Sequence, residues 1–548
     1  MISTQLHRST TSTTTAVPAA GSGRAVVRLT ARLVRRATLI AAASLAGYVA
    51  LEMVSYVKAY PDAASRARIS TFGEVGAARA LQGIPHGVQT VGGFVAWDTG
   101  WIIGLIIGVW GILLATRLLR GDEDDDRAQW VAAAPVRAGR ALAAQLAVLF
   151  TAALTITLAI TITLLVGGAD PVGCVLFGAG LTGFAGTWLA VAAVTAQVFG
   201  LRRRAVAVAS AVLGATFVVR MVADGAGSRG WLRWVTPFGW MEELQPFAGQ
   251  RWPVLALLAI VPVLLVAVAA VLRGRRDLGA GLVGGADRRP PRLRLLGSTA
   301  GYAWRSGEGV LFAWAAGLGA YAFVMGSMVK SMTDYLAEDE DLRRAMDAMG
   351  MGSAVTVDGF VGVMSVVLGV GFAVYGCWRI AAIRAEEAAG RAELVLSRRV
   401  TRTGWLLGQL AGAVVASAVP LGVSGAALWA GAASTGAELS FVAALQAVAN
   451  TASVVWLFIG LTVLTLGIAP RLTAALPVSL VVAGYLLPVI GGPLELPDLV
   501  IDLSPFHHLA YVPAQPFAAA PAAWMIAIGV VAAVAGVAVF HRRDLHSD

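Results

Sequence analysis

Long apolar blocks, separated by shorter polar segments, run along the whole chain. The blocks Val254 to Leu272 and Ala522 to Phe540 contain no charged residue. An α-helix rises about 1.5 Å per residue, so about 20 apolar residues cross a hydrocarbon core of roughly 30 Å. The pattern predicts about twelve such spans, six in each half of the chain. We place them near residues 37–57, 96–117, 141–166, 171–198, 205–222, 253–273, 308–329, 360–382, 404–430, 438–467, 473–490 and 522–541.

Composition supports membrane spans over a soluble core. Charged residues make up only 14% of the chain, whereas soluble domains carry about 25%. Hydrophobic residues make up 57%, and the mean hydropathy is +0.74. A soluble protein of this size would not have enough charge to cover its surface. The fold class that we expect is an all-α polytopic membrane protein in a lipid bilayer.

The chain is basic, with a net charge of +10, and its arginines stand at the ends of the apolar blocks. Cytoplasmic ends of membrane spans collect basic residues. If the N-terminus is cytoplasmic, about three-quarters of the basic residues fall inside the cell. We therefore expect both termini in the cytoplasm and no nucleic-acid partner. Almost all basic residues are arginine rather than lysine, and alanine, valine and glycine are abundant. This composition is typical of a GC-rich bacterial genome, so we expect a bacterial cell membrane.

The two halves of the chain repeat each other in parallel, since each has six predicted spans. The domains that we expect are a disordered tail (1–22), a first transmembrane domain (23–273), a cytoplasmic linker (274–294) and a second transmembrane domain (295–548). Three groups of matching residues support the repeat. A shift of 264 places Glu123, Arg127 and Gln145 on Glu387, Arg391 and Gln409; a shift of 267 places Gly200 on Gly467; a shift of 268 places Thr236-Pro237-Phe238 on Ser504-Pro505-Phe506.

An amphipathic segment, Arg24 to Arg36, precedes the first span. On a helix, its five arginines share one side, and Val26, Leu29, Leu33 and Val34 occupy the opposite side. Such a helix suits the cytoplasmic membrane interface, with arginines on anionic headgroups. The segment is either a positive-inside anchor or an elbow helix that also touches a partner.

A charged cytoplasmic loop follows the second span of each half. The loops run from Arg117 to Arg140 and from Arg379 to Arg402, and both mix charge with an apolar stripe. A solvated loop that keeps arginines inside would explain the charge alone. A short helix that docks on a partner also explains why the pattern recurs, and we favour it. The candidate coupling residues are Glu123, Arg127, Glu386, Glu387, Arg391 and Glu393.

Catalytic chemistry is not apparent in the sequence. A phosphate-binding loop needs a lysine after a glycine pattern, and neither Lys58 nor Lys330 stands in one. Cys174 and Cys377 fall inside apolar blocks, so we expect neither a disulfide nor a metal cluster. The adjacent His507 and His508 lack companion ligands for a metal. We expect a protein that is not an enzyme and holds no cofactor of its own.

These features together resemble the type-2 ABC exporter permeases. Within them, the fused double-length form is similar to the polyketide-antibiotic (tetronasin-type) exporter permeases. Glu386, Glu387, Gly390, Arg391 and Glu393 resemble the coupling segment of the family, with Leu394 and Ser397 continuing the match. The first half departs from the pattern, with an acidic run and a proline at the corresponding place.

The resemblance implies a compact (type V-like) exporter fold with both transmembrane domains in one chain. It also implies two separate ATP-binding subunits, which hold ATP and Mg²⁺, and export of hydrophobic or amphipathic antibiotics, drugs or lipids from the bacterial inner membrane. The family places the substrate between the two halves. The residues that we expect to line this cavity are Trp101, Leu105, Phe217, Met364 and Leu368.

Two other functions compete with this one. A secondary transporter of the major-facilitator class also has six plus six spans, but the Gly-Arg-Arg of its hallmark loop is missing after Asp126-Arg127. Such transporters usually keep carboxylates within the membrane, and only Glu52 and Asp98 are candidates here. A membrane-embedded enzyme would need acids or histidines clustered at one membrane face. Copurification of an ATPase would separate an ABC permease from both.

Overall fold

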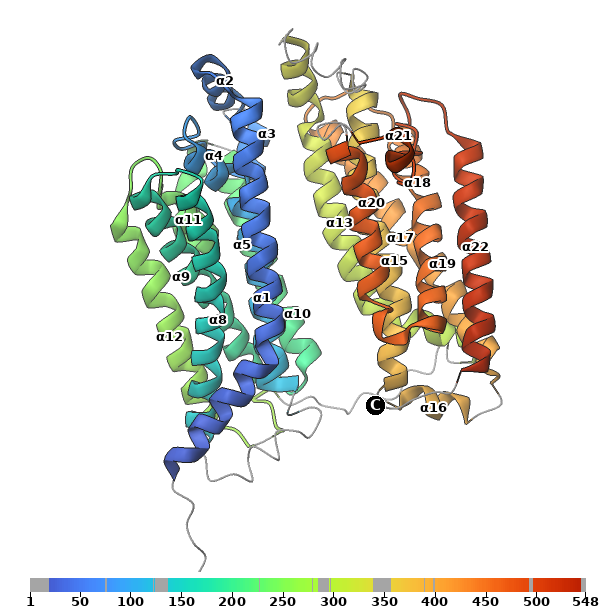
Figure 1. The fold of residues 1–548 in the computed structure, drawn as a ribbon, viewed down its shortest axis with the longest axis horizontal. Coiled ribbons are helices and arrows are strands. Elements are labelled where there is room, and N and C mark those ends of the chain that lie inside the picture. The colour runs from blue at the N-terminus through green and yellow to red at the C-terminus, as the bar shows by residue number, and fades with distance from the viewer. Residues whose placement is uncertain are drawn as a thin grey trace, which may run out of the picture. The chain divides into compact units, whose positions relative to one another are not determined.

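The computed structural model describes residues 19–73, 76–121, 123, 137–225, 227–277, 279–283, 295, 297–338, 356–388, 390–397, 400–491 and 496–543. Helices dominate these residues, and their one β-contact is an isolated bridge between Phe199 and Val283. The chain divides into two compact units, Met1–Arg289 and Pro290–Asp548 (Figure 1). The boundary falls within the predicted linker.

The first unit is a bundle of long helices with short helices at one end (Figure 1). Its long helices are α1 (Ala19–Ala59), α5 (Gly100–Thr116), α8 (Ala138–Val166), α9 (Pro171–Val198), α10 (Arg202–Gly225) and α12 (Leu255–Gly274). A π-helical turn, η1 (Arg117–Gly121), extends α5. The short elements are α2 (Ala63–Gly73), α3 (Gly76–Gln82), α4 (Val91–Asp98), η2 (Gly227–Val235), α11 (Pro237–Glu243) and η3 (Trp252–Val254).

The second unit has a similar order of elements. Its helices are α13 (Thr299–Glu338), α15 (Val357–Ala388), α16 (Arg391–Leu396), α17 (Arg402–Ser434), α18 (Phe441–Asn450), α19 (Ala452–Ile468), η5 (Pro470–Leu472), α20 (Ala475–Gly491), α21 (Asp498–Ile501) and α22 (Ala519–Arg542). Among the described residues, 11 helices are long and apolar enough to cross a membrane. The remaining predicted span, the eleventh in chain order (473–490), coincides with α20, whose apolar part, Ala475–Val489, is shorter. The all-α polytopic prediction is confirmed.

The predicted elbow is not a separate helix. It forms the first turns of α1, which runs without interruption from Ala19 to Ala59 and therefore also begins inside the predicted tail. The reason is local, because no glycine or proline stands between Gly23 and Gly47 to end the helix. Val26 and Val34 are buried, whereas Leu29 and Leu33 are exposed. In Figure 1 the first turns of α1 lean away from the rest of the helix.

Glycines let the last long helix of each unit approach its neighbour closely. In the second unit, Gly460 and Gly467 of α19 face Gly529 and Gly536 of α22, and a methyl group on any of them would collide with the opposite backbone. In the first unit, a methyl group on Gly183 of α9 would collide with the backbone of α12. Small residues drive helix association in membranes because they permit such contact. The close packing fixes where the ends of α12 and α22 lie.

Candidate functional site

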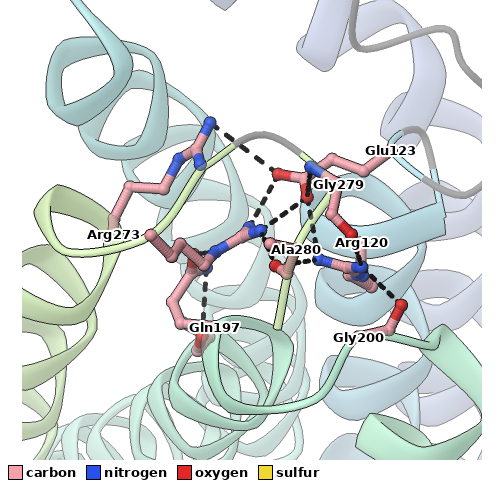
Figure 2. A network of polar contacts seen from close by, with 9 residues as sticks. Arg120, Glu123, Gln197, Gly200, Arg273, Gly279 and Ala280 are labelled. Carbon is pink, nitrogen blue, oxygen red and sulfur yellow. Dashed lines mark hydrogen bonds and ion pairs between the residues drawn. The ribbon is translucent and has the colours of Figure 1, made fainter. Parts of the chain in front are cut away.

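Glu123, a predicted coupling residue, is buried at the end of the second span of the first unit. Its side chain is only 7% exposed, and three arginines surround it (Figure 2). Arg276, which follows α12, donates from Nη1 to Glu123 Oε2 and from Nη2 to Oε1, both at 2.7 Å. This paired geometry is the strong form of an arginine–carboxylate contact. Arg273 lies 3.7 Å from the same carboxylate.

The arginines tie Glu123 to two other segments of the unit. Arg276 Nε donates to the Gln197 side chain at the end of α9, at 2.7 Å. Arg120, which is 1% exposed, reaches Glu123 Oε2 at 2.9 Å. It also donates to the carbonyl oxygens of Gly279, Ala280 and Gly200. One carboxylate therefore joins the end of the second span, the turn after α9 and the segment after α12.

The second unit contains the same kind of contact. Glu387, at the end of α15, is 3% exposed and accepts two hydrogen bonds from Arg543 Nη2, at 2.5 and 2.7 Å. Arg543 follows α22, and its Nη1 donates to the carbonyl oxygen of Leu466 in α19 at 3.2 Å. Arg384 lies 3.8 Å from the same carboxylate. The elements joined are the second span, the end of α19 and the end of the last helix.

We call these two contacts the carboxylate clasps: Glu123 with Arg276 in the first unit, and Glu387 with Arg543 in the second. They occupy equivalent positions of the repeat. The glutamates differ by 264 residues and the arginines by 267, the same shift that relates Gly200 to Gly467. Removing one partner of a buried ion pair is costly, because it leaves the other charge buried without a counterion. Each clasp therefore holds the end of the last helix against the end of the second span of its unit.

Comparison with known proteins identifies the family. The family model described as "Multidrug efflux system permease Rv1217c, C-terminal domain" matches residues 70–273 and 296–541, one range in each unit. The multidrug efflux system permease protein Rv1217c of Mycobacterium tuberculosis is 34% identical over 496 residues, covering 89% of this chain and 88% of that protein. The chain belongs to this family of multidrug efflux permeases. It is a multi-pass transport protein rather than an enzyme.

Part of the predicted docking surface of this permease is exposed and part is not. Glu387, one of the predicted coupling residues, is not on the surface, because its side chain is buried against Arg543. Arg391 and Glu393 are exposed on the short helix α16, as is Leu394, at 72%. Gly390 begins this helix with φ 69°, a left-handed conformation that favours glycine.

The remaining two predicted coupling residues are Glu386 and Arg127. Glu386 is half-buried, and its Oε2 accepts a hydrogen bond from the Tyr302 hydroxyl at 3.3 Å. Arg127 lies outside the described residues. The short helix predicted for each charged loop can therefore be compared with the structure in the second unit only, where α16 is a short helix directly after α15.

The five predicted cavity residues fall in both units. Trp101 and Phe217 stack with ring centroids 5.9 Å apart, and Leu105 is half-buried on the same helix as Trp101. Met364 is half-buried and Leu368 fully buried on α15 of the second unit. That all five line one substrate cavity stays a prediction. Trp101, however, also lines a cavity within the first unit.

Potential metal ligands are dispersed. Cys174 and Cys377 are free and buried. Across the part of the chain that the structure describes, no three His, Cys, Asp or Glu side chains are grouped to hold a metal ion. His507 pairs with Asp502 at 3.6 Å instead.

Proposed function

We propose that this efflux permease is the membrane subunit of an ATP-driven ABC exporter of the fused, tetronasin-type form. One chain supplies both transmembrane domains, and two copies of a separate ATP-binding subunit hold ATP and Mg²⁺. The substrates are hydrophobic or amphipathic compounds, exported from the cytoplasm or inner leaflet of a bacterial cell membrane. Both termini lie in the cytoplasm.

The observation that carries this proposal is the position of α16. This short helix presents Arg391, Glu393 and Leu394 to the outside directly after α15. It follows the second span without another membrane crossing between them, so it lies on the cytoplasmic side in the proposed orientation. A chain without a phosphate-binding loop of its own needs such a contact to receive the energy of ATP hydrolysis.

The clasps explain how a small contact could move a whole domain. Glu387 and α16 are separated by only a few residues, and Glu387 is bonded to the end of α22. A push on α16 therefore reaches both α15 and the last helix. In the first unit, Glu123 links the corresponding loop to α12 through Arg276.

Copurification and reconstitution test the proposal. The tagged chain is expressed in its native host, an associated ATPase is identified, and the complex is placed in liposomes. Export of a hydrophobic dye should require ATP and Mg²⁺, and the dye should stimulate ATP hydrolysis. A variant ATPase lacking the phosphate-loop lysine should abolish both. Export driven by a proton gradient without ATP would instead identify a secondary transporter.

A further inference from the structure

A second site lies inside the first unit, at the other end of α5 from the Glu123 clasp. It is a cavity of about 80 Å³ between α3, α4, α5, α9, α10 and α11. Much of its wall is aromatic. The rings that line it are Trp97, Trp101, Phe177, Phe184, Phe238 and Phe247.

Two acceptor atoms at this cavity lack a donor. Glu242 Oε1 accepts a hydrogen bond from the backbone N–H of Ile84 at 2.6 Å, but its Oε2 is buried and unbonded among the described residues. Gln82 donates from Nε2 to Asp98 at 2.6 Å, and its Oε1 is likewise buried without a partner there. Buried acceptors normally find donors, so both atoms require an explanation.

Two of the three carboxylates around the cavity form ion pairs with arginines. Asp224 lies 3.4 Å from Arg220 and 3.7 Å from Arg233. The neighbouring Glu243 lies 3.1 Å from Arg233 and 2.7 Å from Arg251. Among the described residues, Glu242 forms no ion pair within 4.0 Å, although its charge attracts the guanidinium of Arg220. Arg220 is also at the cavity, but its Nη2 is bonded to the Ala80 and Leu81 carbonyl oxygens.

The fold itself does not need these buried polar groups. The repeat places Leu487, within α20, at the position of Arg220, and Ala510, in the non-helical segment between α21 and α22, at the position of Glu242. Buried charges are costly and persist where they serve a function. The polar cavity is therefore a specialisation of the first unit.

We propose that this cavity binds the ammonium end of a cationic amphipathic substrate. Glu242 Oε2 opposes the positive charge, Gln82 Oε1 accepts a hydrogen bond where the ammonium carries one, and Trp97 and Trp101 offer cation–π contacts. A cavity of this size holds a headgroup, so the apolar tail lies elsewhere. Binding is a property of the chain alone; that the ligand is an export substrate rests on the proposed function.

Binding to the full chain in nanodiscs tests the proposal, with protein-free nanodiscs subtracted. The probes are octyltrimethylammonium and octanesulfonate, which share a chain and differ in the sign of the headgroup charge. Octyltrimethylammonium should bind more tightly. Glu242→Gln should weaken its binding by about tenfold or more, as loss of a contact to a charged group does. Glu243→Gln is the matched control, and it should change the affinity less than about threefold.

A second variant keeps the test decisive if Glu242→Gln does not fold. Ala96 lines the cavity, and Ala96→Leu should fill the space and abolish binding while retaining all the charges. Equal or tighter binding of octanesulfonate would overturn the proposal and assign the site to Arg220. Unchanged binding in Glu242→Gln would also overturn it. No ATPase is present, so failure of ATP-driven export leaves this result intact.

Discussion

Arg543 holds the Glu387 carboxylate through two hydrogen bonds of 2.5 and 2.7 Å, although 156 residues separate them. Glu123 and Arg276 repeat this relationship across 153 residues. In each unit the pair closes the bundle, because it joins the end of the second span to the end of the last helix. The clasps thus have a structural role that is separate from any contact with a partner.

Replacing one partner of the second clasp should destabilise the unit more than replacing both partners. Glu387→Leu leaves Arg543 without its carboxylate and should cost about 3 kcal/mol, as stranding one partner of a buried pair does. The Glu387→Leu, Arg543→Leu double variant should recover much of this loss. Thermal unfolding in detergent, followed by the fluorescence of a buried tryptophan, measures both. Equal destabilisation by the single and double variants would show that the pairing itself is unimportant.

The two arginines that follow Glu123 along the chain near the first clasp, Arg276 and Arg273, should contribute unequally to stability, because they differ in their distance from the Glu123 carboxylate. Arg276 makes two 2.7 Å contacts with Glu123, so Arg276→Ala should cost about 3 kcal/mol. Arg273 stands 3.7 Å away, and Arg273→Ala should cost less than about 1 kcal/mol. The two variants serve as controls for each other under identical unfolding conditions. The same loss of stability in both would mean that net charge, not the bidentate contact, holds Glu123.

The spans could be predicted from sequence because length and hydropathy alone decide them. The clasps could not. Arg276 and Arg543 follow the last apolar block of each half, where any arginine fits the positive-inside rule. Glu387 stands four residues before Arg391, which is the i,i+4 spacing of an ion pair on a helix surface. Nothing local shows that a partner 156 residues away competes for the same carboxylate.

The polar cavity was missed for a similar reason. Glu242 lies in the tryptophan-rich segment before α12, where aromatic side chains suggest only an interfacial anchor. Glu242 becomes part of a cavity only together with Gln82 and Trp97, which come from other elements. A difference between the halves was the available signal, since the repeat puts Ala510 at the position of Glu242.

Membrane orientation can be tested with single cysteines. Native Cys174 and Cys377 are replaced first. Arg203→Cys should be protected from an impermeant thiol reagent in intact cells, because the proposed topology puts the start of α10 in the cytoplasm. Arg229→Cys, beyond the other end of α10, should be labelled. Permeabilised cells provide the control in which both react. The reverse pattern would place both termini outside the cytoplasm.

Acid should weaken the first unit through His86. Burial, followed by the charges of Arg251 and Arg233, lowers the pKa of His86 below its usual value of 6.5. Between the folded and unfolded pKa values, the unfolded chain binds the extra proton, so stability falls as pH drops from about 6.5 toward the lower folded pKa. His86→Gln should flatten this part of the stability profile. An identical profile in the variant would assign the acid sensitivity to other groups.

The charged side chains of the exposed helix α16 should be needed for coupling to ATP hydrolysis but not for the folding stability of the protein. Surface charges contribute little to folding, about 0.3–0.5 kcal/mol for an i,i+4 pair. The Arg391→Ala, Glu393→Ala double variant should therefore fold and insert normally. If α16 docks on the ATPase, the variant should lose substrate-stimulated ATP hydrolysis and export together, while basal ATP hydrolysis by the isolated ATPase is unaffected.

A matched control comes from the other end of the second unit. Lys330 and Asp334 form an exposed i,i+4 pair at 3.5 Å near the end of α13. The Lys330→Ala, Asp334→Ala variant removes the same amount of surface charge and should transport normally. Loss of transport in both double variants would point to general surface charge. Normal transport by the Arg391→Ala, Glu393→Ala variant would reduce α16 to a positive-inside anchor, because a docking helix cannot lose its charged contacts without weakening the complex.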